Sequence, residues 1–96
     1  MKDESKLVRI NSKEELVTYI GILFGMLQDY PNALTLEQVQ EVLNIKEKQA
    51  YKKIHTGELP SFWVGNGYRV LKVELVIYLA AKSLDLTKLE DEETAA

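Results

Sequence analysis

The sequence predicts a mostly α-helical fold with one small β-hairpin, and three observations within residues 34–71 support this expectation. Two short stretches have the 3.6-residue apolar spacing of amphipathic helices, and only a tight turn separates them. A glycine and proline break follows the second stretch. Two short apolar runs then flank a Gly-Asn-Gly sequence, which is a hairpin signal. Two helices, a tight turn and a hairpin form the outline of a winged helix-turn-helix.

The first of the two helices is expected to begin at Thr35, because Gln38 follows three residues later with the spacing of a capping box. Apolar residues then recur on one helical stripe, namely Leu36, Val39, Val42 and Leu43. Asn44 tolerates the left-handed conformation that closes helices, and Ile45 supplies an apolar residue to bury the turn.

The second helix is expected over residues 46–55, and Gly57 and Pro60 are expected to end it. Its apolar edge consists of Ala50, Tyr51 and Ile54, which fall within about 100° of arc at ~100° per residue. The opposite side presents Lys48, Gln49, Lys52 and His55. Such a cationic, hydrogen-bonding face suits a helix that enters a DNA major groove, although lysine-rich faces are more often simply solvated.

The hairpin allows two registers around Gly65-Asn66-Gly67. A three-residue loop pairs Val64 with Tyr68, and it places Trp63 and Arg69 together on one face. A two-residue turn at positions 66–67 would pair Val64 with Arg69 and mix the faces. We therefore expect the three-residue loop, with Trp63 stacking on Arg69, packing on the N-terminal segment or facing a partner protein.

With these helices and this hairpin, residues 34–70 resemble the excisionase-type DNA-binding domains, a winged-helix family related to the MerR-like regulators. The matching positions keep type and spacing between residues 34 and 70, about half of the chain; they are Tyr51, Ile54, Gly57, Leu59, Pro60, Phe62, Val64, Gly65, Tyr68, Arg69 and Val70. The resemblance implies that the second helix reads the major groove while the hairpin tip touches the minor groove or its phosphates. It implies DNA contacts by Lys48, Gln49, Lys52, His55, Asn66 and Arg69, to which we add Lys46 and Lys53.

Several positions depart from the family pattern, and the departures remove positive charge. Lys46 replaces a serine-like cap, while Trp63 and Asn66 stand where arginine is common. Glu47 replaces a position that is more often basic, and a carboxylate there suits the helix dipole but repels phosphate. Lys53 occupies a position that is more often apolar.

Residues 11–30 predict an additional N-terminal helix that Pro31 ends, with residues 29–33 as a short linker. Ser12 and Glu15 have capping-box spacing, and the residues that follow are apolar on nearly every side. The apolar stretch is shorter than the roughly 20 residues that span a bilayer, and no signal-peptide pattern follows it, so we expect a cytoplasmic protein. One helix face is expected on the winged core and another on a second copy, with Gly21-x-x-x-Gly25 as weak evidence for a homodimer. The alternative is that this helix only wraps its own core.

A further long helix is expected from about Lys72, with a stripe made of Val76, Leu79, Ala80 and Ser83. The chain would then divide into an N-terminal arm and helix (1–33), a winged helix-turn-helix (34–84) and an acidic, disordered tail (85–96). The net charge of −3 arises mainly from the tail, because residues 35–83 hold seven lysines and arginines against five glutamates. This mild positive charge predicts weak DNA affinity for one copy, so binding as dimers or at adjacent sites is expected.

Enzyme and metal chemistry are not indicated. The chain has no cysteine and one histidine, and it lacks a glycine-rich phosphate loop and paired carboxylates at a recognisable spacing. His55 is therefore expected as a surface or groove residue rather than a general base, and no cofactor is expected. The preferred function is a non-catalytic, excisionase-type accessory that binds double-stranded DNA and assists an integrase. A small transcriptional regulator, or a protein-interaction module that has lost DNA binding, is the alternative.

Overall fold

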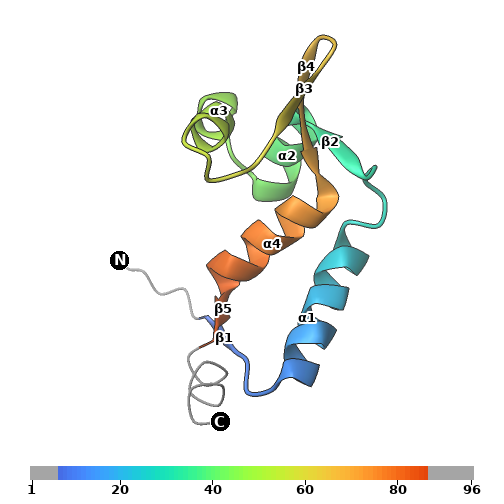
Figure 1. The fold of residues 1–96 in the computed structure, drawn as a ribbon, viewed down its shortest axis with the longest axis vertical. Coiled ribbons are helices and arrows are strands. Elements are labelled where there is room, and N and C mark those ends of the chain that lie inside the picture. The colour runs from blue at the N-terminus through green and yellow to red at the C-terminus, as the bar shows by residue number, and fades with distance from the viewer. Residues whose placement is uncertain (1–6, 87–96) are drawn as a thin grey trace.

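Residues 7–86, the part of the chain that the computed structural model describes, form helices and short strands in the order β1-α1-β2-α2-α3-β3-β4-α4-β5 (Figure 1). The helices are α1 (Lys13–Met26), α2 (Leu36–Leu43), α3 (Glu47–His55) and α4 (Lys72–Ser83). The strands are β1 (Val8–Arg9), β2 (Ala33–Thr35), β3 (Phe62–Val64), β4 (Gly67–Leu71) and β5 (Leu84–Asp85). This mostly helical fold with a hairpin agrees with the predicted fold class and is compatible with a winged helix-turn-helix.

The hairpin belongs to a three-stranded antiparallel sheet with the strand order β2-β4-β3. Leu34 of β2 pairs with Val70 of β4, and both side chains are fully buried. The expected linker over residues 29–33 is wrong at its end, because Ala33 belongs to β2 and pairs with Leu71. A three-residue strand carries too little periodicity to be recognised without its partner.

The predicted hairpin register is also wrong. β3 and β4 pair Val64 with Gly67 and Trp63 with Tyr68, so a two-residue Gly65-Asn66 turn joins them. Gly65 has a φ of 59°, and a glycine with positive φ at the first central position is typical of the type II′ turns that favour two-residue hairpins. Trp63 therefore shares a face with Tyr68 rather than with Arg69.

The caps of α2 and α3 confirm the signals read from the sequence. The Thr35 hydroxyl accepts a hydrogen bond from the Gln38 backbone N–H (3.2 Å), and the Gln38 side chain accepts one from the Thr35 N–H (2.9 Å). Asn44 closes α2 in the left-handed conformation with a φ of 56°, and Gly57 has a φ of 81° just after α3. These local signals determine where the two helices begin and end.

The N-terminal helix differs from its prediction at both ends. α1 ends at Met26 with Leu27 as its C-cap, several residues before Pro31. At its start, the Ser12 hydroxyl accepts from the Glu15 N–H, but the Glu15 carboxylate accepts from Asn11 instead of completing the box with Ser12. Among the described residues, none of the helices is both long and apolar enough to cross a membrane.

The predicted helix after the hairpin is present as α4, and it lies between α1 and the sheet (Figure 1). The largest fully buried side chains come from the sheet, α2, α4 and the loop before β3; they are Leu34, Val39, Leu59, Val70, Leu75 and Val76. After α4, β5 pairs in parallel with β1 and Leu86 packs against the core, so Asp85 and Leu86 are not part of a disordered tail as expected. The rest of that expected tail, residues 87–96, lies outside the described residues.

Candidate nucleic-acid interface

The polar face of α3 is open to solvent. Lys48, Gln49, Lys52 and His55 are all exposed, while Ala50 and Ile54 are buried on the opposite edge. Packing against α2 fixes that buried edge, and the remaining surface of α3 projects at the same end of the molecule as the hairpin (Figure 1). The structure therefore leaves two lysines, a glutamine and a histidine available to a ligand that meets α3.

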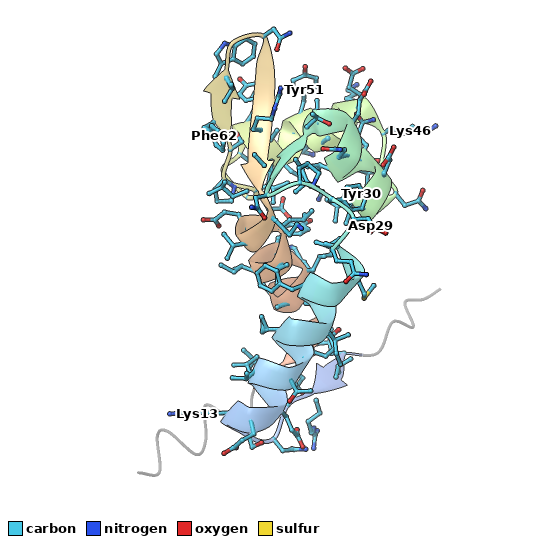
Figure 2. The ribbon with its side chains drawn as sticks, turned by 90° about the vertical axis from the view of Figure 1, so that its right-hand side faces the viewer. Lys13, Asp29, Tyr30, Lys46, Tyr51 and Phe62 are labelled. Carbon is cyan, nitrogen blue, oxygen red and sulfur yellow. The ribbon has the colours of Figure 1, made fainter. Side chains whose placement is uncertain are left out.

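Gln49 and Lys46 have a structural relationship at the start of α3. The Gln49 side-chain oxygen accepts a hydrogen bond from the Lys46 backbone N–H at 3.0 Å. This bond engages the carbonyl end of the Gln49 amide, and the NH₂ end is the donor that remains. The Lys46 side chain is exposed, and Figure 2 shows it at the outer edge of the helix pair, away from the hairpin.

Tyr51 lies at the edge of α3 that faces the hairpin, with 36% of its surface exposed rather than in the core as its spacing predicted. Its ring centroid is 6.1 Å from that of Tyr68 and 5.8 Å from that of His55. The His55 ring lies 6.2 Å from Tyr68, and Trp63 lies 5.0 Å from Tyr68 at an interplanar angle of 85°. We refer to Tyr51, His55, Trp63 and Tyr68 as the ring cluster, and it joins α3 to the hairpin.

Lys53 is turned away from the other cations of α3. Its ammonium lies 3.6 Å from the Glu58 carboxylate and 5.4 Å from the centre of the Tyr78 ring. The oxygen of Tyr78, and to a smaller extent the Glu58 carboxylate, raise the pKa of Lys53. Of the predicted DNA contacts on α3, Lys53 is thus the one that is engaged with α4. The sequence could not show this, because Tyr78 lies 25 residues further along the chain.

The hairpin presents Asn66 at its exposed tip, while Arg69 is half-buried on the central strand β4. The Arg69 guanidinium donates a hydrogen bond to the Tyr68 carbonyl at 3.0 Å. Arg69 pairs across the sheet with Thr35 on one side and Phe62 on the other. Figure 2 shows Phe62 and Tyr51 on opposite sides of the hairpin. Trp63 contacts Tyr68, an arrangement that the three expected placements of Trp63 did not include.

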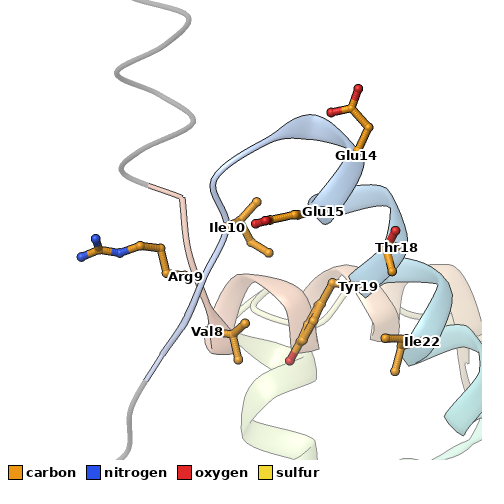
Figure 3. A pocket seen from close by; sticks show the side chains of 8 residues that line it. All are labelled: Val8, Arg9, Ile10, Glu14, Glu15, Thr18, Tyr19 and Ile22. Carbon is orange, nitrogen blue, oxygen red and sulfur yellow. The ribbon is translucent and has the colours of Figure 1, made fainter.

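Two surface hollows lie near α3 and α1. One of 320 Å³ flanks α3 and is lined by Ile45, Gln49, Lys52, Lys53, Thr56 and Glu58. Another of 340 Å³ lies between β1 and α1, where Val8, Ile10 and Ile22 make its walls mainly apolar (Figure 3). Within residues 7–86 no cluster of three or more histidine, aspartate or glutamate side chains could hold a metal ion. The candidate interface is the end of the molecule formed by α3 and the hairpin, because the exposed polar side chains of α3 and the exposed Asn66 lie there.

A family model described as a helix-turn-helix domain matches residues 33–83, more than half of the chain. The protein therefore belongs to the helix-turn-helix domain family. The match is consistent with an excisionase-type DNA-binding domain, and the family indicates DNA binding rather than catalysis. No curated protein and no solved structure matches the chain.

Proposed function

We propose that the protein binds duplex DNA with α3 in the major groove and the β3–β4 hairpin at the backbone or in the adjacent minor groove. The observation that carries this proposal is the exposure of Lys48 and Lys52 at the same end of the molecule as the hairpin. The full contact set comprises Lys46, Lys48, Gln49, Lys52, Lys53, His55, Asn66 and Arg69. Within this set, Lys48, Lys52 and Asn66 carry most of the contact, because Lys53 and Arg69 already have protein partners.

The role that this binding serves is accessory and non-catalytic. An excisionase-type protein bends DNA and assists an integrase, which performs the chemistry of site-specific recombination. The family match and the excisionase-like pattern support this role. The DNA-binding unit in this proposal runs from β2 to the end of α4 (residues 33–83), it follows an N-terminal arm and helix, and the protein acts in the cytoplasm.

A homodimer formed through α1 would give the weakly cationic unit a second set of DNA contacts. On α1, Val17 and Met26 are 70% and 71% exposed, and, apart from the backbone of α1 itself, no atom of residues 7–86 lies within 4 Å of a Cβ placed at Gly21 or Gly25. These glycines are therefore not used to approach the chain's own core, which favours a second copy over the alternative of simple wrapping. α1 also lies away from α3 and the hairpin, so pairing leaves both free (Figure 1).

The second candidate function is a protein-interaction module without DNA binding. The exposed side chains of α1, together with the exposed Trp63 on the hairpin, support it. In that case Trp63 and α1 would be the contact surfaces, and the lysines of α3 would only be solvated. A small transcriptional regulator would use the same DNA interface as the accessory protein.

A fluorescence-anisotropy titration of a mixed-sequence duplex, repeated over a range of salt concentrations, tests DNA binding. We expect salt-sensitive binding by the unchanged protein. In the variant Lys48→Gln/Lys52→Gln the log–log salt slope should become shallower by about 0.9 for each lysine. The matched control is Asn11→Asp/Gln28→Glu, which changes the net charge equally near the two ends of α1 and should retain the original slope.

The remaining functions can be separated with the same preparation. Failure of the unchanged protein to bind at micromolar concentration and low salt would favour the interaction module. If DNA is bound, stimulation of excision by an integrase encoded beside this protein would establish the accessory role, and repression of a neighbouring operon would establish the regulator. Light scattering coupled to size-exclusion chromatography tests the dimer, and a monomer at high micromolar concentration would remove that proposal.

A further inference from the structure

The ring cluster lies where α3 meets the hairpin, and it is not part of the hydrophobic core. The ring contacts of Tyr68 with Tyr51 and His55 link the two elements, and Trp63 extends the cluster along the hairpin. None of the four side chains is fully buried, and Trp63 is 61% exposed. Exposed aromatic side chains that gather at one place commonly mark a binding surface.

The geometry of a DNA duplex indicates which part of the duplex would face the ring cluster. A major groove and its neighbouring minor groove are separated by one sugar–phosphate strand. A protein that puts a helix into one groove and a hairpin at the other must straddle that strand. The junction of the two probes then faces the strand, and in this protein the junction consists of the ring cluster.

The chemistry of the cluster suits such a strand. It holds four polar groups that can donate hydrogen bonds, namely the Tyr51 and Tyr68 hydroxyls, the Trp63 indole N–H and a His55 ring N–H. Within residues 7–86 none of these groups is hydrogen-bonded to the protein. Tyrosine hydroxyls commonly donate to phosphate oxygens, and the ring faces can pack on the apolar side of deoxyribose.

The cluster is continuous with the cationic face of α3. At ~100° per residue, Lys48 and His55 lie on the same side of α3 about two turns apart, and Lys52 lies between them along the helix. Glu47 lies on the other side of Tyr51, so one carboxylate borders the cluster at the start of α3. The lysines therefore approach the strand from one side of the rings.

We propose that the ring cluster binds the DNA strand that runs between the two grooves. The hydroxyl and ring N–H groups would donate hydrogen bonds to its phosphates, and the ring faces would pack on its sugars. This inference rests on the proposed DNA-binding function. It predicts a contribution to affinity that, unlike that of the lysines, does not depend on the salt concentration. A neutral donor releases no counterion, so its loss weakens binding at every salt concentration and leaves the salt slope unchanged.

The first test compares two pairs of tyrosine-to-phenylalanine changes in the full chain, with the same duplex titration. Removing the hydroxyls in Tyr51→Phe/Tyr68→Phe should weaken binding by about tenfold or more, as expected for hydrogen bonds to a charged group, without altering the slope. The control Tyr19→Phe/Tyr30→Phe removes hydroxyls that bond to Ser83 and Glu41, neither of which belongs to α3 or the hairpin, and should bind like the unchanged protein. Circular dichroism melts would verify that both variants are folded.

The second test uses Trp63 as a reporter, because it is the only tryptophan in the chain. Saturation with duplex should quench its emission and protect it from acrylamide. The inference is overturned if the unchanged protein binds duplex but Trp63 emission and accessibility stay the same, or if Tyr51→Phe/Tyr68→Phe binds as tightly as the control. Tighter binding of a single strand than of duplex, with Trp63 quenched, would also overturn it by assigning the rings to unstacked bases. The salt slope of Lys48→Gln/Lys52→Gln tests the proposed function independently of these outcomes.

Discussion

The Glu58 carboxylate lies 3.2 Å from the Lys82 ammonium, and this ion pair connects the loop after α3 to α4. The Tyr78 hydroxyl donates a hydrogen bond to the same carboxylate at 3.2 Å, and Lys53 of α3 approaches it to 3.6 Å. Glu58 is thus the point at which the end of α3 is tied to α4. The tie contributes to the position of the helix that we propose as the DNA-reading element.

Replacing Glu58 by glutamine should lower the free energy of unfolding in a pH-dependent way. The hydrogen bond from Lys82, followed by that from Tyr78 and the charge of Lys53, holds the pKa of Glu58 below its ordinary value of 4.5. A carboxyl with a lowered pKa in the folded state stabilises the protein above the unfolded pKa, and this stabilisation is lost as the pH falls through the folded pKa. The effect of Glu58→Gln should therefore be present at neutral pH and small well below pH 4.5.

Urea unfolding at neutral and acidic pH measures this difference. Because the carboxylate is solvent-exposed, we expect a modest effect. Glu14→Gln, an exposed change in the first turn of α1, serves as the control for simple loss of a negative charge. An equal destabilisation by Glu58→Gln at both pH values would show that the ion pairs do not contribute.

Capping provides a second prediction, since Thr35 and Ser12 begin helices with different numbers of hydrogen bonds. Thr35 has both bonds of its capping box and is half-buried, whereas Ser12 has only the bond from Glu15. Thr35→Ala should cost about 1–2 kcal/mol, and Ser12→Ala roughly 0.5–1 kcal/mol. Thr35→Ser keeps the hydroxyl and should recover most of the loss, as judged from urea midpoints. The capping assignment fails if serine is no better than alanine at position 35.

These caps show which parts of the structure are encoded locally. Thr35, Asn44 and Gly57 each determine a helix end through a backbone preference or a nearby side chain, and the sequence predicted all three. The pairing of β2 with β4 depends on residues more than 30 positions apart, so the short strand could not be recognised. The candidate site likewise has features that were predictable from local sequence and features that were not. Exposure of α3 followed from helical spacing, whereas the turn of Lys53 toward α4 depended on tertiary contacts.

The two adjacent lysines of α3 give a third prediction, because they have different surroundings. Lys52 is exposed, and Lys53 is paired with Glu58. If α3 contacts phosphates, Lys52→Gln should reduce the log–log salt slope of duplex binding by about 0.9, and Lys53→Gln should change it less. The anisotropy titration measures both slopes under identical conditions. Equal reductions would mean that Lys53 leaves Glu58 when DNA binds.

The glycine variants test the hairpin register in a fourth prediction. Gly65 has a φ of 59°, while among the described residues no atom beyond its two chain neighbours lies within 4 Å of a Cβ placed there, so alanine would strain the backbone without a clash. Gly65→Ala should cost about 1 kcal/mol. In the monomer, at a protein concentration too low for pairing through α1, Gly21→Ala makes the same chemical change at an open position inside a helix and should instead stabilise the protein by roughly 0.5–1 kcal/mol.

Gly67 distinguishes the observed register from the alternative two-residue turn at positions 66–67. In the structure, a Cβ at Gly67 would lie 3.3 Å from the end of the flexible Arg69 side chain, which can move aside. Gly67→Ala should therefore cost less than Gly65→Ala in urea unfolding. The reverse order would place the positive φ at position 67 and shift every pair of the hairpin. Trp63 would then no longer lie opposite Tyr68, and the ring cluster would lose its link along the hairpin.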